Sequence, residues 1–165
     1  MSLHNIIIGL ACMLMLGGCT SLSKQQIDSA MIDQLASVEI ITPSGRTGQI
    51  YSQSLRQNMF SSYDAETRYR LSSSIKISSS ETFAVRGVSS DFRKMTMTVS
   101  FTLTDMHTNS VAIQNAVAAS ATLGTVSSTY GIEQSELQAK KRLATLLAER
   151  VRRRLQLYFL SIAQT

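Results

Sequence analysis

One stretch of the sequence, Lys94-Met95-Thr96-Met97-Thr98-Val99-Ser100-Phe101-Thr102-Leu103-Thr104, decides the fold of this chain. Every second side chain in it is large and apolar, and those between are hydroxyls or a lysine. Successive side chains of a β-strand point to opposite faces of the sheet. The alternation therefore predicts a strand with one buried face and one open face rich in serine and threonine.

Similar patterns predict strands on both sides of this one. A shorter strand is expected over 82–88, with a turn over 87–91. A hairpin loop over 105–109 should lead to a last strand from Val111 to about Ala121, and a loop of small residues over 122–131 follows. An earlier strand has an apolar set, Tyr69, Leu71, Ile75 and Ile77, and a polar set, Arg70, Ser72, Ser74, Lys76 and Ser78.

A further β-branched run, 38–42, stops at Pro43, which has no N–H to donate to a sheet. The turn residues over 44–48 carry hydroxyls suited to capping a helix. That helix should run to about Phe60, with one face made of Tyr51, Leu55 and Met59.

From about 132 to 162 the apolar spacing becomes helical. Glu133 and Glu136 lie early in this helix and Arg150, Arg152, Arg153 and Arg154 late, an order that suits the helix dipole. The apolar stripe consists of Leu137, Ala144, Leu147, Val151, Leu155, Phe159 and Ile162.

The predicted order is β-α-β-β-β-β-α. Runs of strands with helices at the flanks are typical of an α+β domain in two layers. We therefore expect a two-layer sandwich, in which two helices pack on one face of a mostly antiparallel sheet of four to five strands.

The N-terminal segment has the features of a signal peptide. Its apolar run, 6–16, is too short to cross a bilayer, which needs roughly 20 apolar residues. Leu16-Gly17-Gly18-Cys19 looks like a bacterial lipobox, in which the cysteine is acylated, with palmitate-type chains, and becomes the new N-terminus. An uncleaved inner-membrane anchor is the alternative. We expect a lipoprotein signal peptide over 1–18, the lipidated Cys19 and a tether over 19–36, and one domain over 37–165.

The predicted tether has two possible conformations. Ile27, Met31 and Leu35 have helical spacing, although the same residues fit an extended chain equally well. Thr20, rather than an aspartate, follows the cysteine, as in lipoproteins sent on to the outer membrane. We therefore expect the protein on the periplasmic side of the outer membrane, anchored in its inner leaflet.

Removal of eighteen residues from 165 leaves 147, enough for a single domain. The signal contains no charged side chain, so the mature chain keeps the net charge of +5, which favours anionic partners. Nucleic acid is not expected as a partner of an exported chain. Because Cys12 leaves with the signal, the mature chain has one cysteine and cannot form an internal disulfide.

Catalytic patterns are absent from the sequence. His107 is the sole histidine of the mature chain, and we interpret it as an exposed turn residue. The acidic residues form no pair suited to acid–base work, and no zinc spacing or nucleophile elbow occurs. We expect neither an enzyme nor a metal site, and no cofactor beyond the lipid on Cys19.

Cations share the predicted open face with the hydroxyls. Arg70, Lys76 and Lys94 lie in the polar phase of their strands, and Arg86 lies near the first hairpin turn. These residues suit a surface for anionic lipid or for a polar protein cavity. They also suit an ordinary solvated face whose lysines protect the sheet.

The sequence resembles the lipopolysaccharide (LPS) assembly lipoprotein family, LptE, most closely its short alphaproteobacterial forms. The resemblance is carried, in order, by the lipobox, residues 38–40, Gly45-Arg46-Thr47-Gly48-Gln49, the helix that follows, Tyr69-Arg70-Leu71, the 93–99 strand, the Asp105 hairpin and the final Arg152-Arg153-Arg154-Leu155. The family fold is a sheet with two helices.

The resemblance implies a non-catalytic protein that plugs the outer-membrane β-barrel LptD, assists its assembly and contacts LPS. It also implies that Arg86 is the hairpin cation linked to LPS binding. A second cation is expected in the loop before the last helix, but 122–131 contains none. The alternative function is that of an accessory lipoprotein in another lipid or solute transport system.

Overall fold

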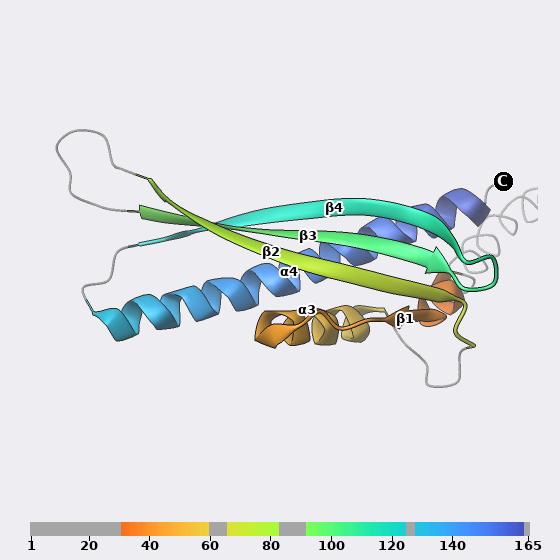
Figure 1. Cartoon of the computed structure of the whole chain (residues 1–165), viewed down its shortest axis with the longest axis horizontal. Helices are drawn as coiled ribbons and strands as arrows, with labels where there is room; N and C mark the ends of the chain where they lie inside the picture. Colours follow the sequence, from red (N-terminus) through yellow and green to blue (C-terminus); the bar gives the residue numbers. More distant parts are fainter. Residues whose placement is uncertain (1–30, 60–65, 83–91, 125–127, 164–165) are drawn as a thin grey trace, which may run out of the picture.

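The computed structural model describes residues 31–59, 66–82, 92–124 and 128–163. Four strands and two long helices follow one another along the chain (Figure 1). They are β1 (Val38–Ile40), α3 (Gly45–Asn58), β2 (Tyr69–Thr82), β3 (Phe92–Asp105), β4 (Ser110–Leu123) and α4 (Thr129–Ala163).

The strands form one sheet in the order β1-β2-β3-β4, with β1 parallel to β2 and the other pairs antiparallel. Both helices lie on the same side of this sheet (Figure 1). The predicted α+β architecture with a mostly antiparallel sheet is therefore confirmed. Of the additional strand predicted over 82–88, only Thr82 is described, and it is the last residue of β2.

The alternation along β3 produces the core. Met95, Met97, Val99, Phe101 and Leu103 are all at most 1% exposed. They pack in one cluster with apolar residues of both helices, including those predicted for α3. The core residues of the helices, with Met59 directly after α3, are Tyr51, Leu55, Met59, Ala139, Leu143, Ala144, Leu147, Ala148, Val151, Leu155 and Phe159.

The two helices cover different lengths of the sheet. A strand rises about 3.3 Å per residue, so the 14 residues of β2 span roughly 46 Å. A helix rises about 1.5 Å per residue, so the 35 residues of α4 span about 52 Å and the 14 of α3 only about 21 Å. Only α4 can therefore run the length of the sheet, and Figure 1 shows it doing so.

Three residues that the alternation and the helical spacing predict to be buried are exposed. Ile77 near the end of β2 is 37% exposed, and Leu137 and Ile162 near the ends of α4 are 50% and 43% exposed. Met97, which is opposite Ile77 on β3, is fully buried, so at this level of the sheet the exposure is confined to β2. The correct period therefore does not ensure burial at the ends of long elements.

The position of α3 depends on a close approach between its backbone at Gly48 and the backbone of Pro43. A Cβ atom built on Gly48 would lie 2.2 Å from the carbonyl oxygen of Pro43, so only glycine fits there. Gly45 has a φ of +82°, in the left-handed region that favours glycine. The predicted hydroxyl cap is wrong at the N-cap itself, because the side chain of Ser44 makes no capping hydrogen bond.

The end of the predicted tether packs on the domain. Residues 31–36 are helical, and Leu35 is 2% exposed within the core cluster. The rest of the predicted tether, Cys19 and the signal peptide lie outside the described residues.

Helix arginines bond to backbone at both edges of the sheet. Arg56 donates to the carbonyl oxygen of Ile40 in β1 at 2.9 Å. Arg150 donates to the carbonyl oxygen of Ala118 in β4. Beside it, the amide of Ala116 donates to the side-chain oxygen of Asn115 at 2.7 Å.

Candidate binding surfaces

The open face of the sheet is lined by hydroxyls. The strand register places Ser74 beside Ser100, and Thr96 lies between Ser78 and Ser120. The hydroxyls of Thr96 and Ser120 lie 2.9 Å apart and bond to each other. The predicted serine and threonine face is therefore present, and hydroxyls of neighbouring strands can bond to each other or to a polar partner.

The predicted cations on this face are spread out. Arg70 donates from Nε to a carboxylate oxygen of Glu39 at 2.9 Å, so a neighbour on β1 already balances its charge. Lys94 is opposite Ser80, four residues along β2 from Lys76, a separation of about 13 Å. Arg86 lies outside the described residues. Arg70, Lys76 and Lys94 thus give the face a diffuse positive charge without forming a single phosphate site.

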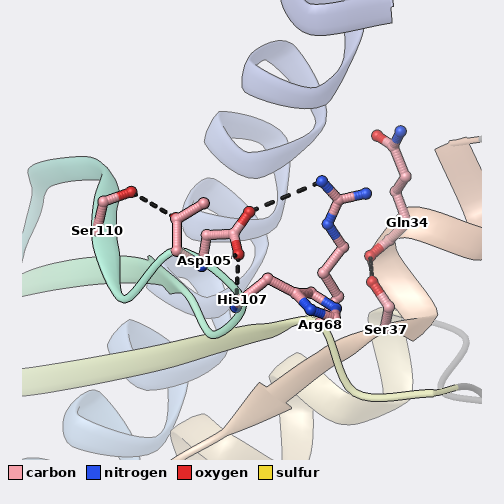
Figure 2. Close-up of polar contacts among 7 residues, drawn as sticks. Gln34, Ser37, Arg68, Asp105, His107 and Ser110 are labelled. Carbon is pink, nitrogen blue, oxygen red and sulfur yellow. Dashed lines mark hydrogen bonds and ion pairs between the residues drawn. The ribbon is translucent and has the colours of Figure 1, made fainter.

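His107 lies in the hairpin between β3 and β4, where Asp105 organises the turn (Figure 2). The backbone amides of His107 and Thr108 donate to Oδ1 of Asp105 at 2.8 and 3.3 Å. Oδ2 faces a guanidinium nitrogen of Arg68 at 3.7 Å. The hydrogen bond from the backbone amide of His107 lowers the pKa of Asp105 below its ordinary value, and the Thr108 amide and the positive charge of Arg68 act in the same direction.

Among the described residues, the acidic, histidine and cysteine side chains form no group that could hold a metal ion. The same part of the chain contains no helix both long and apolar enough to span a bilayer.

The arginines of α4 need a different explanation from the dipole. The helix runs on to Ala163, and its last turn contains no basic residue and its first turn no acidic one. Because the dipole acts only over the terminal turns, it cannot explain a cluster that ends nine residues earlier, at Arg154. The dipole interpretation of this charge order is therefore wrong.

Three of these arginines instead line a hollow beside the edge of β4. We call it the arginine hollow; its walls are residues 116–118 of β4 and Arg150, Arg153, Arg154 and Leu157 of α4. Leu157 is 60% exposed, although it is large and apolar. Arg153 is paired with Glu149, one turn away on the same helix. Three guanidinium groups and an exposed leucine thus share one opening.

The fold is similar to those of solved lipoproteins, at low sequence identity. A protein from Caulobacter crescentus, described as a candidate lipoprotein, matches 79% of this chain and 96% of its own, with 16% identity and a TM-score of 0.64. A minor lipoprotein from Acinetobacter baumannii matches 72% of this chain and 91% of its own, with 14% identity and a TM-score of 0.54. No protein-family model and no curated protein matches the chain.

Sequence reasoning missed the arginine hollow because it treated the arginines as part of a dipole pattern. The available signal was Leu157, which lies outside the apolar stripe and one turn from Arg153 and Arg154. The side of β4 on which those arginines lie depends on how α4 crosses the sheet, which the sequence pattern did not specify.

Proposed function

We propose that this protein is an envelope lipoprotein, anchored to the outer membrane through Cys19, that binds and plugs a β-barrel of the LptD type and assists LPS assembly. The role is non-catalytic, and the barrel and LPS are the partners. The observation that carries the proposal is the two-sided sheet, helix-packed on one face and hydroxyl-lined on the other.

The open face suits the interior of a barrel. Lumen-facing positions of outer-membrane barrels are polar, so a plug must present polar groups to them. Thr96, Ser100 and Ser120 lie on this face, and its spaced lysines add charge. Such a surface can exchange hydrogen bonds with water for hydrogen bonds with a polar wall at little net cost.

Lipidation is supported by two independent observations. The lipobox residues 16–19 end a short apolar run at the N-terminus. The Caulobacter and Acinetobacter proteins of similar fold are described as lipoproteins. A domain of this fold behind a lipidated cysteine fits attachment to an envelope membrane.

Affinity purification of the tagged, lipidated protein from outer membranes, followed by mass spectrometry, tests the partner. An LptD-type barrel should be recovered in a near one-to-one ratio. Recovery of the lipoprotein as a free monomer would contradict the plug. The mass of the N-terminal peptide checks the lipid on Cys19 in the same sample.

A matched pair of variants tests the face. Ser100→Trp places a bulky group on the open face, whereas Gln138→Trp places it on an exposed position of α4. Ser100→Trp should reduce barrel recovery at unchanged melting temperature, and Gln138→Trp should not. Equal recovery of the barrel by both variants would remove the open face from the interface.

Depletion separates the proposal from its alternative, an accessory lipoprotein of another transport system. Stalled LPS transport supports the barrel plug. Normal surface LPS together with a defect in another lipid or solute supports the alternative.

A further inference from the structure

The strongest unexplained feature outside the open face is the arginine hollow. Residues 149–157 of α4 contain four arginines and one acidic residue, Glu149, so this surface is strongly cationic. The residues of β4 that line it, 116–118, are two alanines and a valine. Cationic and apolar groups in one opening match an amphiphile with a phosphate head better than a free, fully hydrated anion.

We infer that the arginine hollow binds the phosphate of an anionic phospholipid, so that the outer side of α4 lies on the membrane surface. The inference rests on the proposed lipid anchor and gives the orientation of the anchored domain at the bilayer while it is outside a barrel, since a domain inside the lumen cannot lie on the membrane surface. Arg153 and Arg154 would contact the phosphate, and Leu157 would reach toward the acyl boundary. Guanidinium groups suit phosphate because their planar N–H donors can bond it in pairs.

The position of the chain ends supports this occupant. Residues 31–36 and the C-terminal end of α4 lie at the same end of the molecule (Figure 1). A chain from Cys19 to Met31 reaches at most about 40 Å when fully extended. Arg154 lies nine residues before Ala163, about 14 Å along the helix axis. An anchored domain therefore holds the arginine hollow within reach of the lipid headgroups.

The exposed face of α4 supports the same orientation. Leu146 and Leu157 are 40% and 60% exposed, and arginines lie between them. A helix that lies in a membrane interface carries apolar side chains for the acyl boundary and cations for anionic headgroups. The remaining exposed cations of α4, Lys141 and Arg142, lie two to three turns farther from its end and outside the hollow.

A single tryptophan can report the docking, because the chain contains none. Leu157→Trp places the probe in the hollow, and Phe92→Trp places it at the far end of the sheet on an exposed site. Each full mature protein, with its lipid verified by mass, is reconstituted into vesicles. The vesicles are phosphatidylglycerol with phosphatidylcholine, or phosphatidylcholine alone.

The expected result is a blue shift of the emission of Trp at position 157 in the phosphatidylglycerol vesicles only, with no shift at position 92. Arg153→Glu with Arg154→Glu should lower the ratio of docked to undocked molecules by roughly 30-fold or more, the size expected for losing two cations near an anionic surface. Lys141→Glu with Arg142→Glu makes the same charge change outside the hollow and should keep most of the shift.

Three outcomes would overturn the inference. The first is an equal emission shift of the tryptophan at position 157 in neutral vesicles, and the second is an equal loss of docking in both charge-reversed pairs. The third is an emission shift with inorganic phosphate in the absence of vesicles, which would assign the hollow to a free anion. Absence of lipid on Cys19 in the mass measurement would instead contradict the proposed function, so the two failures can be told apart.

Discussion

The two ends of β2 obey the same sequence pattern but differ in burial. Near the base, where β2 begins and α4 ends, Leu71 and Leu103 are fully buried. Near the tip, where β2 ends and α4 begins, Ile77 of β2 is 37% exposed, although Met97 opposite it on β3 is fully buried. The difference follows from helix length, because α3 reaches only part of the way along β2, whereas α4 packs against β3 and β4. Alternation specifies which face can be buried, and the covering helix decides how far burial extends.

The largest effect should come from shortening one apolar side chain at each end. Leu71→Ala should lower the free energy of unfolding by about 2–5 kcal/mol, because it removes buried methyl groups and leaves a cavity. Ile77→Ala should cost less than about 1 kcal/mol, because its side chain is already partly in water. Urea denaturation measures both. Equal losses would show that the tip is packed as tightly as the base.

Alkaline pH should destabilise the base specifically, through Tyr51. Burial raises the pKa of Tyr51 from 10.0 to about 12, although its hydrogen bond with Ser73 acts in the opposite direction. The unfolded chain therefore loses this proton first. The protonated Tyr51 contributes fully to the free energy of unfolding below pH 10. This contribution, up to about 3 kcal/mol, is lost as the pH rises to about 12.

Tyr51→Phe should accordingly flatten the fall in stability over that pH range. Tyr130 at the tip is 71% exposed, and Tyr130→Phe is the matched control that should leave the profile unchanged. Denaturant midpoints measured at several alkaline pH values make the comparison. An unaltered slope in Tyr51→Phe would show that another group controls alkaline unfolding.

A smaller effect is expected from the ion pair of the tip. Arg93 donates to Glu136 at 2.7 Å, and both side chains are partly exposed. Glu136→Gln should cost less than about 1 kcal/mol, because solvent and salt screen such pairs. The cost should shrink further in high salt. A salt-independent loss above that size would mean that the tip depends on this contact for its packing.

The smallest effect should come from the basal hairpin under acid. Asp105 has a lowered pKa, so its contribution is present above its unfolded pKa, near 4, and is lost as the pH falls through the folded value. Asp105→Asn keeps an acceptor for the turn amides but loses the charge facing Arg68. Its melting temperature should therefore depend less on pH in the acid range than that of the unchanged protein. Parallel melting curves against pH would contradict the assignment.

The sequence was most informative where one local pattern determines one structural property. Alternation over residues 94–104 predicted β3, its buried set and its hydroxyl face. The helical stripe predicted α4, apart from its exposed ends. The exposure of Ile77 could not be predicted, because it depends on the ratio of helix rise to strand rise and on where α3 stops along β2.

The binding surfaces were predicted less completely than the fold. The polar phase of Arg70, Lys76 and Lys94 was read from the strands, but their separation follows from the register between β2 and β3. The arginine hollow requires α4 to lie beside residues 116–118 of β4, a long-range arrangement that no local spacing contains. Pairing of Arg70 with Glu39 likewise depends on the parallel contact between β1 and β2.

The arginines at the sheet edges affect whether copies of the protein associate through their sheets at high local concentration. A neighbouring copy that tried to extend the sheet at Ala118 would have to displace Arg150 from its carbonyl, and at Ala116 it would find the amide already bonded to Asn115. Arg56 obstructs the opposite border at Ile40 in the same way. Copies concentrated in one plane would therefore be discouraged from polymerising strand by strand, a hazard that grows with local density.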